Sequence, residues 1–283
     1  MAKNLLKAGY SLTVYNRSAK ALRWFQDQGI RVVETPAKGA EDADAIITML
    51  ADDDAVSQVL GDEETGCIRS VKAGALVIDS STISPSLSRS LSTRFMVKGV
   101  VMLDAPVTGS APQAQDGTLT FIVGGKEDAY HQAEPLFRAM GRRAVYIGPS
   151  GSGSTVKLAN NIMGAINMMA VAEGLSIVQK SGLDAEKFFD VIAGGGANNG
   201  MVISKREKVL NRRYTPDFTA RLMLKDLRLA SHLAWNLDIP LPGLALISNL
   251  YQIACHTGAS ESDMSALLET YEKLSGTTQT PEG

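Results

Sequence analysis

The sequence has few residues of the kinds that build disulfide frameworks or metal centres. Two of its 283 residues are Cys and three are His. Cys67 and Cys255 lie far apart in the sequence, and the three His residues show no spacing typical of metal ligands. This pattern excludes a disulfide framework and argues against a zinc site. We therefore predict no metal site and a reducing, cytoplasmic location.

The sequence also lacks an excess of charge and an uninterrupted apolar run. Its formal net charge is -2, which leaves no basic footprint for nucleic acid. The longest apolar stretch, 162–178, carries Asn167 and Glu173, whereas a membrane span needs ~20 predominantly apolar residues. The first residues already have a helical pattern, so we expect no signal peptide. We predict neither a nucleic acid nor a membrane as a partner.

The first half of the chain alternates short β-rich runs with helical stretches, which is typical of βαβ units and a mostly parallel sheet. We predict strands at 11–16, 30–33, 45–49, 75–79, 100–105, 119–123 and 144–147, with helices at 18–28, 84–97 and 126–140. The predicted fold is α/β, a Rossmann-like doubly wound sheet. We place this NADP-binding domain at residues 1–149.

The second half contains no convincing strand. Breaker residues at 149–153 precede a long apolar helix at 156–180. Further helices are predicted at 184–193, 202–211, 219–236, 242–257 and 263–273. We predict an all-α substrate and oligomerisation domain at 150–283. A helix that is apolar on most sides must be buried, either among other helices or in a partner subunit.

Polar residues follow the first predicted strand, at Asn16, Arg17 and Ser18. In a doubly wound dinucleotide fold this strand end meets the adenosine ribose, where an Arg accommodates a 2′-phosphate. The alternative is a helix N-cap at Ser18 beside a solvated Arg.

Two further strand ends carry hydroxyl groups. The run 80–82 follows a strand and precedes a helix, and Thr82 is a candidate cofactor contact, although Ser84 alone could cap that helix. Thr108, Gly109 and Ser110 offer hydroxyls and backbone N–H groups ahead of a short helix. This arrangement suits a carboxylate, because helix N-termini favour anions, but an ordinary turn explains it equally well.

The most informative segment is 151–161, in which Lys157 and Asn161 are four residues apart on one helix face. An ammonium desolvated in an apolar helix has a pKa below its ordinary value and can supply a proton at neutral pH. The alternatives are a Lys that extends its head to solvent and a surface Asn. Lys225 and Asp226 occupy adjacent helix positions, and taken alone they favour a solvated charged pair.

Taken together, the segments D-A-P-V-[ST]-G, G-x-G-x-x-x-K-x-x-N-N and F-x-x-x-L-x-x-K-D-L resemble the β-hydroxyacid dehydrogenase family over essentially the whole chain. That family includes 3-hydroxyisobutyrate dehydrogenases and tartronate, glyoxylate and succinic semialdehyde reductases. The resemblance implies an NAD(P)-dependent oxidoreductase that interconverts a small 3-hydroxy or 2-hydroxy acid and its semialdehyde or keto form. It also implies a homodimer or homotetramer.

The resemblance assigns roles at matching positions. Catalysis falls to Lys157 and Asn161, and substrate binding to Thr108, Gly109, Ser110, Asn161 and Asp226. The expected cofactor contacts are Asn16, Arg17, Ser18, Leu50, Ala51, Thr82, Phe218 and Lys225. The first three lie where family members bind the adenosine 2′-phosphate, which favours NADP as the cofactor, with NAD as the alternative. The sequence departs from the family at Thr108 (commonly Ser), Ser110 (often Gly) and Ala51 (often Pro).

The largest departure lies at the start. The family begins with a strand and a loop of the type G-x-G-x-M-G-x-x-M-A-x-N-L, and residues 1–5 match only its end. We expect a truncated sequence or a mis-assigned start codon. Two neighbouring strands should then have unpaired backbone groups, and the cofactor loses its main anchor. A catalytically impaired ligand-binding or oligomerising homologue is the alternative function.

Overall fold

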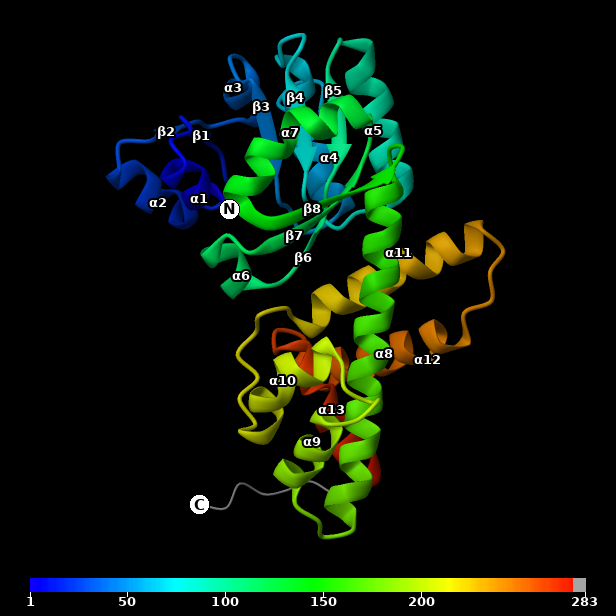
Figure 1. Ribbon diagram of the computed structural model, residues 1–283. Coiled ribbons are helices and arrows are strands. Elements are labelled where there is room, and N and C mark those ends of the chain that lie inside the picture. Colours follow the sequence, from blue (N-terminus) through cyan, green and yellow to red (C-terminus); the bar gives the residue numbers. More distant parts are fainter. Residues whose placement is uncertain (277–283) are drawn as a thin grey trace. The chain divides into compact units, whose positions relative to one another are not determined.

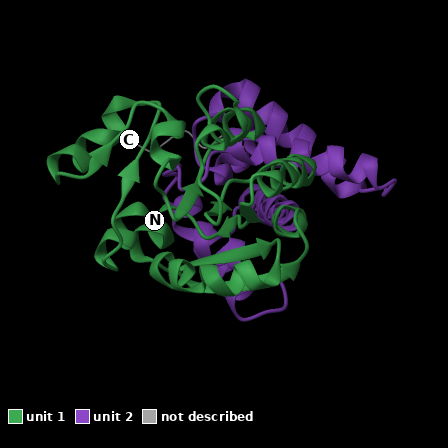
Figure 2. Cartoon of the chain, turned by 90° about the horizontal axis from the view of Figure 1, so that it is seen from above, with its two compact units in different colours: residues 1–157 green, residues 158–283 purple. Residues whose placement is uncertain are grey.

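The computed structural model describes residues 1–276 and divides into two compact units, residues 1–157 and 158–283 (Figure 2). Unit 1 is an α/β unit. Its strands are β1 (Thr13–Val14), β2 (Arg31–Val32), β3 (Ala45–Thr48), β4 (Leu76–Asp79), β5 (Val101–Asp104), β6 (Val107–Thr108), β7 (Leu119–Gly124) and β8 (Gly141–Gly148). Its helices are α1 (Ala2–Lys7), α2 (Ala19–Asp27), α3 (Pro36–Ala40), α4 (Asp53–Gly61), α5 (Pro85–Val97), α6 (Ala111–Asp116) and α7 (Glu127–Met140), with a 3₁₀ turn at Cys67–Arg69.

The main sheet of unit 1 has six strands, and most of its pairings are parallel. Strands β3, β4 and β5 are parallel neighbours, β7 runs antiparallel to β5 and β6, and β8 pairs parallel with β7. The register aligns Asp79 of β4 with Asp104 of β5, so two acidic residues end adjacent strands.

Helices cover both faces of this sheet (Figure 1). Because side chains alternate along a strand, Val77 and Met102 pack with α4 and α5 on one face. Ile78 and Leu103 pack with α1 and α7 on the other face. The prediction of a Rossmann-like doubly wound sheet is confirmed. The prediction missed β6, α3 and α4, because their short segments lack a clear periodicity.

Strands β1 and β2 form a separate parallel pair. Within residues 1–276, β1 pairs with β2 alone and β3 pairs with β4 alone, so no described strand joins the pair to the main sheet. The expected unpaired backbone groups therefore lie along one edge of β1 and one edge of β3.

Unit 2 is helical, and its described residues form no strand beyond one isolated bridge between Thr219 and Asp263. The long helix α8 (Ser152–Lys180) contains the boundary between the units. It is followed by α9 (Ala185–Ala193), α10 (Gly200–Leu210), α11 (Ala220–Asn236), α12 (Pro242–Ala254), a π turn at Cys255–Ala259, a 3₁₀ turn at Met264–Ala266 and α13 (Leu267–Ser275).

The helix α8 is only partly buried. Leu158, Met168 and Leu175 lie in the core of unit 2, whereas Met163 and Ile177 are 66% and 70% exposed. The other helices of unit 2 therefore cover only one side of α8, and burial of the other side in a partner subunit stays a prediction. By length and composition alone, α8 is also the one described helix that could cross a membrane.

A buried ion pair links α10 to the segment before α13 in unit 2. Lys205 of α10 lies 2.9 Å from the fully buried Asp263, which also accepts hydrogen bonds from Asp217 N and from the hydroxyl of Ser265. Burial alone would raise the pKa of Asp263, but the hydrogen bond and charge of Lys205 outweigh it, so the pKa is lowered. Asp263 therefore remains an anion at neutral pH and holds α10 against the segment before α13.

Candidate active site

The two predicted catalytic side chains are both buried on α8. Lys157 is 9% exposed and Asn161, one helical turn later, is 6% exposed. The helix begins at Ser152 and not at Val156 as predicted, so Lys157 lies in its second turn. Both side chains are therefore largely buried, and little of Lys157 reaches solvent.

Asn161 is anchored by a carboxylate of α11. Its Nδ2 donates a 2.6 Å hydrogen bond to Asp226 Oδ2, and Lys225 Nζ lies 2.8 Å from Asp226 Oδ1. Asp226 is 1% exposed and Lys225 is half-buried. The expectation of a solvated Lys225–Asp226 pair is wrong, because Met223, Leu224 and Leu227 bury this face of α11.

The segment predicted to hold a carboxylate takes an ordered form. Thr108 ends β6 and is half-buried, and Gly109 is exposed with a φ of +114°, a conformation that favours glycine. Ser110 is the N-cap of α6, and both its N–H and its hydroxyl donate to Gln113 Oε1. The backbone N–H of Ser110 already donates to Gln113, so the expectation that it is free to bind a carboxylate is wrong.

Buried hydrogen bonds tie together the loops that follow β3 and β4. Asp79 Oδ1 accepts from the hydroxyl of Thr48 at 2.7 Å and from the hydroxyl of Ser81 at 2.6 Å, and Ser81 Oγ accepts from Leu50 N at 2.8 Å. Burial raises the pKa of Asp79, the hydrogen bonds from Ser81 and Thr48 oppose this rise, and the nearby Asp104 adds to it. The network fixes the two loops that carry Leu50, Ala51 and Thr82.

Two polar atoms at the end of β4 have no partner in this network. Asp79 Oδ2 and Ser80 Oγ are buried and have no hydrogen-bond partner among the described residues. Thr82 is half-buried and Ala51 is exposed. Polar groups at the carboxyl ends of parallel strands are where α/β sheets bind nucleotides, so these loops fit the polar part of a nicotinamide cofactor.

The corner after β1 is open to solvent. Asn16, Arg17 and Ser18 are all exposed, and Asn16 Oδ1 accepts a 2.8 Å hydrogen bond from Ser18 N. Ser18 occupies the N-cap position of α2 but makes no side-chain capping bond, which weakens the simple capping interpretation. Arg17 makes no ion pair within residues 1–276, so its guanidinium is available to an anion.

The remaining predicted contact, Phe218, belongs to unit 2. Its ring is half-buried and packs against the core of that unit, and its carbonyl accepts from Met264 N. Within the described part of the chain, no group of three or more His, Cys, Asp or Glu side chains could hold a metal ion.

Sequence reasoning assigned no role to three buried polar residues at the strand ends: Thr48, Asp79 and Asp104. A usable signal was present, since Asp79 and Asp104 each end an apolar run of the sheet. A carboxylate is almost never fully buried without partners, so an Asp within such a run indicates an organising hydrogen-bond acceptor.

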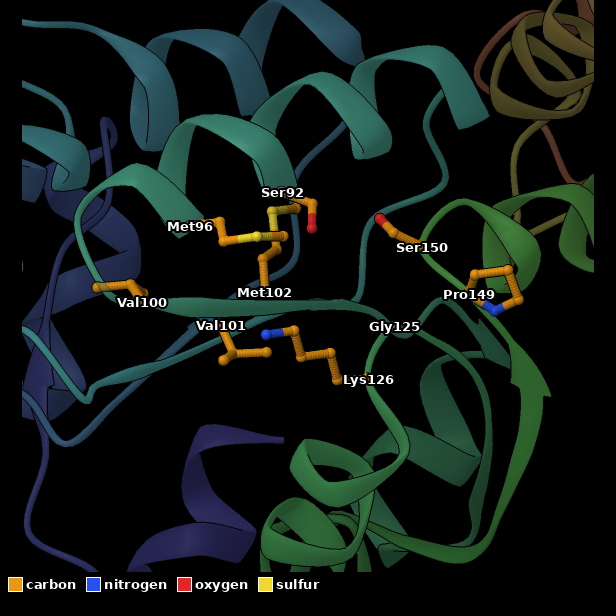
Figure 3. Close-up of a pocket in the computed structure, with 9 residues that line it drawn as sticks. All are labelled: Ser92, Met96, Val100, Val101, Met102, Gly125, Lys126, Pro149 and Ser150. Atoms are coloured by element: carbon orange, nitrogen blue, oxygen red, sulfur yellow. The ribbon is translucent and has the colours of Figure 1, made fainter.

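A small pocket of about 170 Å³ lies elsewhere in unit 1 (Figure 3). Met96 of α5 and Met102 of β5 lie close together in it, and Lys126, Pro149 and Ser150 complete part of its lining. None of the predicted site residues lines it. Its mostly apolar wall is distinct from the polar strand ends described above.

Two family models match the chain in tandem. Residues 1–148 match the NAD binding domain of 6-phosphogluconate dehydrogenase. Residues 151–271 match the model described as NAD-binding of NADP-dependent 3-hydroxyisobutyrate dehydrogenase. Between them the two matches cover most of the sequence.

Individual dehydrogenases and oxidoreductases are also similar in sequence to this chain. The mitochondrial 3-hydroxyisobutyrate dehydrogenase of Homo sapiens is 36% identical over 277 residues, covering 95% of this chain and 82% of that protein. An oxidoreductase of Synechocystis sp. is 34% identical and covers 96% of this chain and 94% of its own length.

Solved structures extend the similarity to the fold. A 3-hydroxyisobutyrate dehydrogenase from Salmonella typhimurium superposes with a TM-score of 0.85 at 27% identity, covering 95% of this chain and 94% of that one. The Mycobacterium tuberculosis 3-hydroxyisobutyrate dehydrogenase with L-serine also gives 0.85, at 28% identity, covering 94% and 92%.

The hydrogen bond between Asn161 and Asp226 can be tested by measuring the free energy of unfolding. Replacing Asn161 with Ala leaves a buried carboxylate oxygen without this donor, which should lower the free energy of unfolding by about 1–3 kcal/mol. Denaturant unfolding followed by circular dichroism measures the change. Asn249→Ala is the control, because Asn249 is exposed and donates only to Ala245 O of its own helix. Equal losses in the two variants would contradict the assigned anchor.

Proposed function

This chain belongs to the β-hydroxyacid dehydrogenase family, and from that premise we propose that it is an NAD(P)-dependent oxidoreductase acting on a small hydroxy acid. The observation that carries the proposal is the arrangement on α8. A buried Lys157 precedes by one helical turn an Asn161 that is hydrogen-bonded to the buried Asp226. Such a pair offers a proton donor and a fixed amide on one helix face.

A bound nicotinamide would supply the hydride to the substrate carbon in the reducing direction and accept it in the oxidising direction. In the reducing direction, Lys157 donates a proton to the substrate oxygen as negative charge develops there. In the oxidising direction, the neutral amine of Lys157 takes the hydroxyl proton. Asn161 holds the substrate oxygen beside Lys157, and Asp226 fixes the rotamer of Asn161 by accepting from its Nδ2.

The substrate is proposed to be a 3-hydroxy or 2-hydroxy acid and its semialdehyde or keto form. We propose that the segment of Thr108, Gly109 and Ser110 binds its carboxylate, with the hydroxyl of Thr108 and the N–H of Gly109 as donors and Ser110 holding the turn through Gln113. A relative was solved with L-serine, a small molecule that carries both a carboxylate and a 3-hydroxyl group, which supports this class. A panel of 3-hydroxyisobutyrate, glyoxylate and succinic, tartronate and methylmalonate semialdehydes, each tested with both cofactors, identifies the substrate.

We propose NADP as the preferred cofactor. The exposed Arg17, with Asn16 and Ser18 beside it, binds the 2′-phosphate. Leu50, Ala51 and Thr82 contact the nicotinamide side, where the Asp79 network fixes their loops. Phe218 and Lys225 contribute cofactor contacts from unit 2. The proposed domain roles follow, with residues 1–149 for the cofactor and 150–283 for substrate and oligomerisation.

We propose that the active form is a soluble homodimer or homotetramer of a reducing compartment such as the cytoplasm. Exposed apolar side chains of unit 2 support an interface: Met163 and Ile177 of α8, with Leu246 and Ile253 of α12. Met163 and Ile177 are spaced at close to four turns of 3.6 residues, so they lie on one face of α8.

Replacing Lys157 tests the chemistry. Lys157→Ala should lower kcat for 3-hydroxyisobutyrate with NADP⁺ by about 10²–10⁴-fold, the usual contribution of a general acid or base. Lys157→Arg should be equally impaired, because an arginine keeps the charge but does not release its proton. NADPH binding, followed by its fluorescence, should be unchanged in both variants. Lys98→Ala, a change in an exposed lysine, is the control. Retained turnover in Lys157→Ala excludes the assigned role.

Replacing Arg17 tests the cofactor. Arg17→Ala should raise KM for NADP⁺ by about tenfold or more and leave KM for NAD⁺ unchanged, since a hydrogen bond to a charged group contributes about 1.5–3 kcal/mol. Steady-state kinetics with both cofactors measure the ratio. The matched control is Arg23→Ala, on the exposed side of α2. A ratio that does not change would remove Arg17 from the cofactor site.

Charged substitutions test the interface. The double variant Met163→Glu, Ile177→Glu should be monomeric by light scattering at concentrations where the parent is a dimer or tetramer, because it places carboxylates in an apolar contact. Val97→Glu, at a residue of α5 that is 86% exposed, should leave the assembly intact. A monomeric parent chain would refute this interface.

A further inference from the structure

A buried carboxylate at the end of β5 holds the first turn of α8. Asp104 Oδ1 accepts a 2.8 Å hydrogen bond from Gly151 N, and Asp104 Oδ2 accepts a 2.8 Å bond from Ser154 N. Asp104 is 1% exposed. Both carboxylate oxygens therefore bind backbone N–H groups that the start of a helix leaves without helical partners.

Two glycines let the helix approach the strand end this closely. A Cβ at Gly153 would lie 2.5 Å from Asp104 O and 2.4 Å from Ile122 O. A Cβ at Gly124 would lie 2.6 Å from Asp104 Oδ1 and 2.7 Å from Gly153 N. No side chain fits at either position. The second glycine of the G-x-G-x-x-x-K segment thus has a role: it lets α8 dock on Asp104.

A third bond fixes the rotation of the helix. Ser154 Oγ and Ser88 Oγ of α5 are 2.9 Å apart, and both serines are fully buried. Gly153 and Ser154 precede Lys157 by four and three residues, so all three lie on the same face of α8. The docked face of the first turn is the face that carries Lys157 in the next turn.

The charge of the carboxylate also suits this place. A negative group at a helix N-terminus interacts favourably with the helix dipole. Burial raises the pKa of Asp104, and the N–H groups of Ser154 and Gly151 oppose that rise by stabilising the anion. An asparagine could offer one carbonyl oxygen but would turn its NH₂ toward the second N–H, which would lose its acceptor.

We propose that Asp104 is the positioning residue for Lys157, acting through the first turn of α8 without touching the substrate. The inference rests on the proposed role of Lys157 as proton donor. Asp104 sets how closely the first turn of α8 approaches the sheet and, together with the contact between Ser154 and Ser88, the place of the Lys157 amine. A misplacement of about 1 Å can cost about 10²-fold in rate.

A double-mutant cycle tests this proposal with 3-hydroxyisobutyrate and NADP⁺. Asp104→Asn should lower kcat by about 10–100-fold and leave KM for NADP⁺ unchanged. In the Lys157→Ala background, the same Asp104→Asn change should lower the residual kcat no further, because there is no amine left to misplace. A merely structural role would reduce turnover equally in both backgrounds.

The control removes the same kind of cap from another helix. Asp184 accepts from Glu186 N and Lys187 N at the start of α9, and Asp184→Asn should leave kcat unchanged. If Asp104→Asn does not fold, Asp104→Ser keeps one acceptor in a smaller side chain and replaces it in the cycle.

The outcomes separate the two proposals. Full turnover in Lys157→Ala overturns the proposed function. Loss of turnover in Lys157→Ala, combined with full activity of Asp104→Asn or with losses that multiply in the double variant, overturns the positioning role alone.

Discussion

The structure of unit 1 depends on one constraint. The buried carboxylate of Asp104 has hydrogen-bond donors for both oxygens only because α8 begins beside the end of β5. Asp104 ends β5 inside the protein, where an isolated carboxylate would be costly, and the N–H groups of Gly151 and Ser154 supply its partners. The sheet and α8 therefore fix each other. The side chain that we assign to proton transfer, Lys157, takes its position from this contact.

The carboxylate of Asp79, on the neighbouring strand, also organises hydrogen bonds, but between loops. Asp79 lies opposite Asp104 in the register of β4 and β5, and burial raises the pKa of both. Asp79 binds hydroxyls and ties two loops together, whereas Asp104 binds backbone groups and holds a helix. The two aspartates on adjacent strands therefore have different structural roles. Asp79 orders two loops, and Asp104 holds the start of a helix.

Much of this fold could be predicted from local pattern. Apolar runs such as 45–49 and 75–79 identified β3 and β4, and the α/β class is confirmed. The strand β6 was missed because its two residues lie between Pro106 and Gly109, which locally indicate a turn. Lys157 and Asn161 were singled out because residues four apart lie on one helix face, and both are buried. The burial of Asp226 was not foreseen, since it depends on how α11 packs, which adjacent charges do not reveal.

The separation of β1 and β2 from the main sheet has a consequence for handling the protein. Along β3, the main-chain groups that point away from β4 lie on a side where no described strand lies. Such an edge is a template for adding an extended peptide segment, from another copy or from another chain. The outer edge of β3 is therefore a place where a second copy of the chain could add a strand at high protein concentration.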